Sequence, residues 1–128
     1  MKLLLDTHTA LWLVNEDKKL SRGAKAMLVD REHSLYISIA SAWEIAVKTS
    51  IGKMSEFDGG VKKFLAKVED MPVTLLPILP RHIEIVETLP LIHRDPFDRL
   101  LVAAAKAEGM TLLTADENIH RYDVPSVW

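Results

Sequence analysis

The sequence contains no cysteine and no long apolar run. Without cysteine it forms neither disulfide bonds nor thiolate metal sites, which fits the reducing cytoplasm where we expect the chain to act. No stretch approaches the ~20 apolar residues that span a bilayer. The apolar run 3–5 is also too short for the core of a secretory signal. We therefore expect no membrane insertion and no export.

The sequence also lacks a surplus of positive charge. Its 16 lysines and arginines stand against 18 aspartates and glutamates, giving a net charge of −2. Proteins that hold nucleic acid through phosphate contacts alone usually carry a basic surplus. Any phosphate ligand of this chain must therefore be met by a local basic cluster or by a metal ion.

Length and patterning predict one α/β domain over residues 1–128. A chain of 128 residues with 48% hydrophobic residues is ordinary for one globular domain. Apolar, β-rich segments alternate with segments of helical spacing. Strands are predicted at 2–6, 35–39, 73–79, 110–115 and within 122–128, and helices at 7–14, 22–31, 42–51, 57–68, 81–89 and 96–108. This order predicts a three-layer α/β/α sandwich around a mostly parallel sheet of four or five strands.

Several boundaries are marked by particular residues. Asp95 and Pro96 open the helix at 96–108, and Gly109 is suited to close it. Ser41 is predicted to cap the helix at 42–51. Pro77 cannot donate a ladder hydrogen bond, so the strand at 73–79 is predicted to be an edge strand or to end there.

The first and fourth predicted strands both lead into an aspartate, Asp6 and Asp116. Both strands are apolar without alternation, which is typical of parallel strands buried on both faces. Open parallel sheets bind their ligands outside the carboxyl ends of the strands. If the two strands are neighbours, Asp6 and Asp116 face the same crevice.

Glu44 and Asp98 are two further acids near the starts of predicted helices. Each acid also has a structural alternative. Asp6 and Asp116 can cap helices, and Glu44 can pair with Lys48. Asp98, in the first turn of its helix, can interact favourably with the positive end of the helix dipole. Their joint occurrence favours a shared site, in which carboxylates repel one another unless a cation is present. Mg²⁺ and Mn²⁺ prefer carboxylate oxygen and support phosphodiester hydrolysis.

Polar residues beside these acids are candidates for the outer part of the site or for substrate contact. Thr7 and Thr114 can hydrogen-bond metal-bound water or satisfy backbone groups. Asp95 is either a helix cap or a site residue. Arg94 and Arg99 can contact phosphate or balance the negative charge of the cleft.

Three segments carry a family resemblance: LLLDTHTALWLV, SIASAWEIAVK and HRDPFDRLLVAAAKAEGMTLLTADENIHRYDV. In their order and spacing they resemble the PIN-domain ribonucleases, in particular the VapC-type toxins of VapBC toxin–antitoxin systems. The resemblance implies a PIN-like fold and metal-dependent cleavage of single-stranded RNA with Mg²⁺ or Mn²⁺. It also implies a small antitoxin partner and a homodimer. The acidic site that it implies consists of Asp6, Glu44, Asp98 and Asp116.

The apolar positions of helices at 42–51 and 61–68 predict a groove for an antitoxin helix. Two other functions stay open. One is a metal-dependent phosphatase or phosphotransferase on another α/β fold, although His8 stands where a haloacid-dehalogenase-type enzyme has its second aspartate. The other is a module whose acids bind metal without catalysis.

Overall fold

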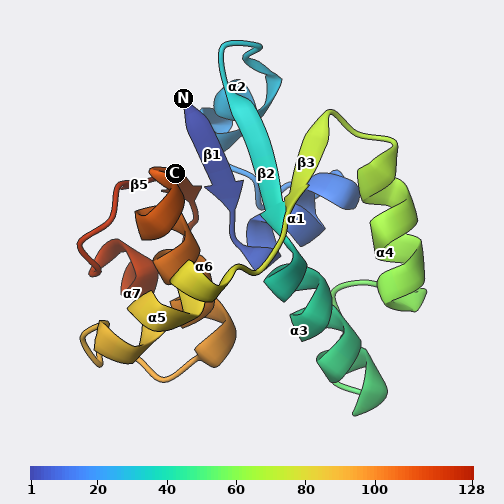
Figure 1. Cartoon of the computed structure of the whole chain (residues 1–128). Helices are drawn as coiled ribbons and strands as arrows, with labels where there is room; N and C mark the ends of the chain where they lie inside the picture. The colour runs from blue at the N-terminus through green and yellow to red at the C-terminus, as the bar shows by residue number, and fades with distance from the viewer.

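A five-stranded, all-parallel sheet forms the centre of the computed structural model, which describes residues 1–128 (Figure 1). The strand order is β3-β2-β1-β4-β5, so β1 and β4 are direct neighbours. The strands are β1 (Lys2–Leu5), β2 (Ser34–Ser38), β3 (Val73–Leu76), β4 (Thr111–Leu113) and β5 (Ser126–Val127). The predicted parallel sheet is confirmed.

Helices cover both faces of this sheet. They are α1 (Thr7–Val14), α2 (Arg22–Val29), α3 (Ile39–Ser50), α4 (Gly60–Glu69), α5 (Pro80–Thr88), α6 (Pro96–Glu108) and α7 (Glu117–His120). Leu4 of β1 packs with Leu101 of α6 on one face, whereas Leu3 packs with Leu11 of α1 and Phe64 of α4 on the other. Successive side chains of a strand point to opposite faces. The three-layer α/β/α sandwich is therefore confirmed, and none of its helices is long and apolar enough to cross a membrane.

Some predicted boundaries need correction. Helix α3 begins at Ile39 because the Ser38 hydroxyl, not Ser41, caps it by accepting a hydrogen bond from the Ala40 amide at 2.9 Å. Strand β3 lies at the sheet edge and ends at Leu76, directly before Pro77. The four-residue helix α7 was not predicted.

Helix α6 has the bounds that its flanking residues predict. Asp95 caps it by accepting from the amides of Phe97 and Asp98, and Pro96 occupies the first helical position. Gly109 ends it with φ of 65°, a left-handed conformation that glycine adopts without a Cβ penalty. This well-defined helix carries Asp98 on its first turn.

Glu108, at the end of α6, joins this helix to α5. Its carboxylate accepts hydrogen bonds from the Arg81 guanidinium and from Nε2 of the buried His82, at 3.0 Å. Nδ1 of His82 accepts from the Leu79 amide at 3.2 Å, so Nε2 carries the ring proton. These donors lower the pKa of Glu108 to about 2.

Glu108→Gln is expected to lower the free energy of unfolding at neutral pH, because the charge-assisted bonds are lost. The carboxyl has a lower pKa in the folded state than its ordinary 4.5. Its contribution is therefore present above pH 4.5 and is lost as the pH falls toward about 2. Urea unfolding at several pH values should show the wild-type advantage shrinking over that range. Glu87→Gln, on the exposed side of α5, is the control, and a pH-independent difference would contradict the expectation.

Candidate active site

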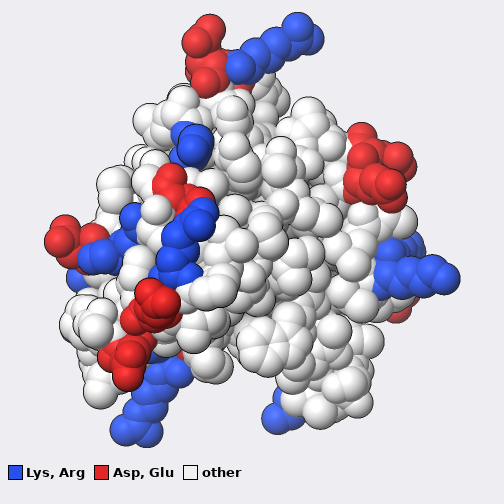
Figure 2. Space-filling view, viewed as in Figure 1, with Lys and Arg blue, Asp and Glu red and all other residues white.

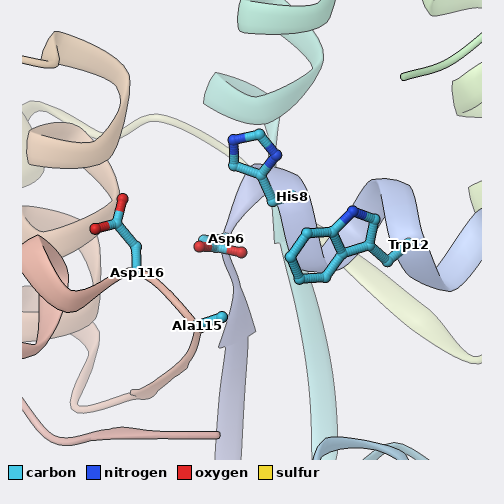
Figure 3. A pocket seen from close by; sticks show the side chains of 5 residues that line it. All are labelled: Asp6, His8, Trp12, Ala115 and Asp116. Atoms are coloured by element: carbon cyan, nitrogen blue, oxygen red, sulfur yellow. The ribbon is translucent and has the colours of Figure 1, made fainter. Parts of the chain in front are cut away.

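Asp6 and Asp116 lie at the same edge of the sheet, outside the carboxyl ends of β1 and β4. Leu5 of β1 is in register with Leu113 of β4, and the Asp6 amide donates to the Leu113 carbonyl at 3.3 Å. Figure 3 shows Asp6 between Asp116 on one side and helix α1 on the other. The pairing of distant strands therefore brings these two acids to one crevice.

Asp6 is a buried acid and a helix cap at once. It is 3% exposed; its Oδ1 accepts from the Thr9 amide at 2.8 Å, and its Oδ2 accepts from the Thr114 hydroxyl. The same hydroxyl accepts from the Asp116 amide at 3.0 Å, so Thr114 links the two acids. Burial raises the pKa of Asp6 in spite of these hydrogen bonds. Its charged form is therefore disfavoured unless a cation is near.

Glu44, on α3, is also buried, with 3% exposure. Its Oε1 accepts from the Thr7 hydroxyl at 2.7 Å, and its Oε2 pairs with the Lys48 ammonium at 2.7 Å. The pairing with Lys48 four residues on is present as the sequence suggested, but on a buried carboxylate and not on a solvated helix face. The hydrogen bond to Glu44 raises the pKa of Lys48.

Asp98 is the acid on which the negative charge of the site acts most strongly. Burial, followed by the charges of Asp95, Glu44, Asp6 and Asp116, raises its pKa to about 8. The Thr114 hydroxyl links Asp6 to Asp116, and Thr7, the residue after Asp6, bonds Glu44. Asp95 bonds the amide of Asp98. These contacts, together with the effect of the other four charges on Asp98, indicate that the five carboxyl groups lie around one region.

A chain of hydrogen bonds through His93 and Tyr122 connects Asp98 to Arg99. Nε2 of His93 lies 3.3 Å from Asp98 Oδ2, and Nδ1 of His93 lies 2.8 Å from the Tyr122 hydroxyl. That hydroxyl accepts from the Arg99 guanidinium at 3.1 Å, so its proton is free to bond His93 Nδ1. His93 then presents an N–H to Asp98. Tyr122 was not predicted from the sequence, in which nothing about its spacing connects it to the acids.

The remaining predicted residues take different positions. Asp95 acts as the α6 cap. Arg94 is exposed. Arg99 is only 8% exposed, and its guanidinium bonds Tyr122 and backbone carbonyls at the end of α5. Arg99 is therefore not available to contact a phosphate, which corrects the first of its two expected roles.

The donor set suits a hard divalent cation in its chemistry but not as a closed cage. No three of the histidine, aspartate and glutamate side chains converge closely enough to hold one ion directly. Mg²⁺ usually keeps several water ligands and binds through one or two carboxylates. The buried carboxyl group of Asp6 and the partly buried one of Asp98, both with raised pKa values, fit such a partly hydrated ion.

Three solved structures share this fold over nearly the whole length of both chains. VapBC2 from Rickettsia felis, bound to a promoter DNA fragment, matches with a TM-score of 0.72 at 15% identity, covering 99% of this chain and 98% of that chain. DNA-bound VapBC from Salmonella typhimurium gives 0.69 at 16% identity, covering 99% and 97%. FitAcB from Neisseria gonorrhoeae gives 0.66 at 17% identity, covering 98% and 96%.

The sequence itself matches a family model as well. A comparison with curated proteins gives no significant match. The model of the PIN domain, in contrast, matches residues 3–125. This range includes every acid of the cluster and all the helices that position them. The chain therefore belongs to the PIN domain family.

Proposed function

We propose that this chain is a Mg²⁺- or Mn²⁺-dependent endoribonuclease that hydrolyses phosphodiester bonds of single-stranded RNA. The observation that carries the proposal is the group of acids at the carboxyl edge of a PIN-domain sheet, where Thr114 links Asp6 to Asp116 and the surrounding negative charge helps to raise the pKa of Asp98. PIN domains are nucleases, and a buried acidic cluster of this kind needs a cation before a phosphate can approach.

In this proposal Asp6, Glu44, Asp98 and Asp116 hold the ion, one or two of them directly and the others through its water ligands. A bound divalent ion lowers the pKa of a water ligand and offsets the negative charge of the phosphate and the leaving oxygen. The surrounding residues fix the carboxylates: the Thr114 hydroxyl orients Asp6, and the Thr7 hydroxyl orients Glu44. Partners of this kind set the direction of ligand oxygens.

Basic side chains at the edge of the cluster complete the proposed site. Arg94 is exposed next to His93 and is free to contact an RNA phosphate. Lys48 bonds Glu44, and the negative charges of Asp95 and Glu56 also help to raise its pKa. With an overall charge of −2, the chain depends on these few cations and on the metal to draw in a polyanion.

Removal of the metal is expected to abolish cleavage. We expect hydrolysis of single-stranded RNA with Mg²⁺ or Mn²⁺, none after treatment with EDTA, and recovery when excess Mn²⁺ is added. An aryl phosphomonoester tests for a phosphatase in the same assay. Cleavage that persists in EDTA, or metal-dependent release of phosphate from the monoester without RNA cleavage, would contradict the proposal.

We further propose that the chain is the toxin of a toxin–antitoxin pair. The structural relatives from R. felis and S. typhimurium are VapBC complexes. An apolar groove of about 590 Å³ lies beside α4 and β3, lined by Ile39, Lys62, Leu65, Ala66, Val68, Glu69, Val73 and Leu75. Helix α3 contributes only Ile39, so the groove lies against β3 more than between α3 and α4. We propose that an antitoxin helix occupies this groove. Coexpression with the small protein encoded by the neighbouring short reading frame, followed by copurification, tests this.

Exposed apolar side chains support the proposal that two copies associate. Trp43 and Ile83 are each 52% exposed, and Leu91 is 87% exposed. The face in Figure 2 carries its charges mainly at the margins, with a broad uncharged area over β2, β3 and α3. Light scattering of the purified chain measures whether a homodimer forms.

A further inference from the structure

A cavity of about 290 Å³ opens directly beside the acidic cluster, lined by Asp6, His8, Trp12, Ala115 and Asp116. Figure 3 shows Asp6 and Asp116 on one side and the rings of His8 and Trp12, both on α1, on the other. Ala115, between β4 and Asp116, has only a methyl group, which leaves the space open. The cavity therefore has one acidic wall and one aromatic wall.

The aromatic wall is held in place by neighbouring groups. The ring centroids of His8 and Trp12 are 5.9 Å apart with the planes inclined by 38°. Nδ1 of His8 lies 3.0 Å from a Glu56 carboxylate oxygen, and Trp12 packs edge-on against Trp128 at 5.7 Å. The His8 side chain is still 47% exposed, so a ring surface is left for a ligand.

We propose that this cavity is a nucleobase subsite, which binds one unpaired base of RNA next to the phosphate that is cleaved. The proposal rests on the proposed function and specifies its substrate. Single-stranded RNA is commonly recognised by stacking of splayed bases on aromatic side chains, including histidine and tryptophan. With a cation held at the acidic wall, the phosphate lies toward Asp6 and Asp116. The uncharged base then lies toward the aromatic wall on α1.

The size and position of the cavity limit what it accepts. A volume of about 290 Å³ is just below the ~300–1,000 Å³ typical of small-molecule sites, which suits one ring system. A base that is paired in a duplex is stacked and cannot enter it. The cavity thus accounts for a requirement for single-stranded substrate without any base-specific hydrogen bond.

The first test uses uncharged ribonucleosides and needs neither metal nor cleavage. Adenosine, guanosine, cytidine and uridine are titrated separately into the metal-free protein while NMR signals of the His8 imidazole and the Trp12 indole are followed. We expect both signals to shift with at least one nucleoside. The signals of His33, which lies at the amino ends of the strands, should stay unchanged. Signals of His8 and Trp12 that do not move with any nucleoside would overturn the proposal.

The second test combines a variant with an altered substrate. A single-stranded RNA oligonucleotide is compared with copies in which one nucleotide at a time near the cleaved bond is an abasic ribose. We expect one abasic position to slow cleavage about ten-fold or more, as loss of a stacked base commonly does. His8→Ala should slow cleavage of the intact oligonucleotide, and the abasic change should then add little, because both remove one interaction.

Matched variants keep this test falsifiable. His33→Ala removes a histidine at the amino ends of the strands, whose Nε2 lies 3.6 Å from Asp30 Oδ2. This variant should leave cleavage unchanged. His8 is exposed, so its variant is expected to fold even if Trp12→Leu does not. Cleavage that is indifferent to every abasic position and to His8→Ala would overturn this inference alone. Nucleoside binding at His8 and Trp12 without any RNA cleavage would instead retain the subsite and reject the nuclease proposal.

Discussion

Asp98→Asn is expected to stabilise the metal-free protein while it slows RNA cleavage by about a hundred-fold or more. Burial and the neighbouring carboxylates raise the pKa of Asp98 from 3.8 to about 8. The folded state therefore holds this proton more tightly than the unfolded state, and stability falls as the pH rises from 3.8 toward 8. Asparagine stays neutral and still accepts the hydrogen bond from His93. At pH 7 the free energy of unfolding should rise.

Cleavage should change in the opposite direction. Metal assistance contributes several kcal/mol to such reactions, and each ~1.4 kcal/mol is a factor of ten in rate. We therefore expect Asp98→Asn to cleave single-stranded RNA about a hundred-fold more slowly or worse at saturating Mn²⁺. Thermal unfolding adds a readout that does not depend on activity. Mn²⁺ should raise the melting temperature of the wild type more than that of the variant.

Asp116→Asn and Asp30→Asn form a matched pair for this experiment. Asp116 caps α7 by accepting from the Asn118 amide at 2.8 Å, and asparagine caps helices about as well as aspartate. Asp116→Asn should therefore lose cleavage with stability nearly unchanged. Asp30, after α2 at the opposite edge of the sheet, accepts from the Glu32 amide at 2.9 Å, and its variant should change neither property. Full cleavage by both Asp98→Asn and Asp116→Asn would reject the site.

Local sequence signals predict the layers of this fold well, but they miss α7 and misplace the start of α3. Helix α6 is correctly bounded because a cap, a proline and a glycine all lie at its ends. At the end of β2 there are two serines, and only the tertiary structure decides that Ser38 and not Ser41 begins the next helix. Ser41 is instead buried against the Thr7 hydroxyl at 2.9 Å. Helix α7 has four residues, too few for a periodic pattern.

The acids of the candidate site can be picked out in the sequence because strand ends and helix starts mark them. Their structural alternatives are also real: Asp6 and Asp116 cap helices, and Glu44 pairs with Lys48. The two kinds of role coexist, because the carboxyl edge of a parallel sheet is also where the next helices begin. The residues that bond the acids from distant parts of the chain cannot be predicted in this way. Tyr122 reaches His93 across 29 positions, a contact that depends on the path of the whole chain.

Arg99 is expected to be essential for stability, although it is one residue from Asp98. Its guanidinium donates to the carbonyls of Val86, Leu89 and Pro90, the last groups of α5 and the turn that follows. The final carbonyls of a helix have no partner within the helix. Arg99→Ala leaves the buried Leu89 carbonyl without a donor. The carbonyls of Val86 and Pro90 keep the amides of Leu89 and Ile92 but lose a charge-assisted bond. We expect a loss of about 3 kcal/mol in the free energy of unfolding.

Arg94→Ala is the matched comparison, because Arg94 is exposed and Arg99 is buried. Its free energy of unfolding should change by less than about 0.5 kcal/mol. Its binding of single-stranded RNA should weaken, and the dependence of that binding on salt should become less steep, since one phosphate contact is lost. Urea unfolding and fluorescence anisotropy at several salt concentrations separate the two arginines. If Arg99→Ala unfolds like the wild type and loses the salt-dependent contact instead, the guanidinium of Arg99 faces the RNA and not the end of α5.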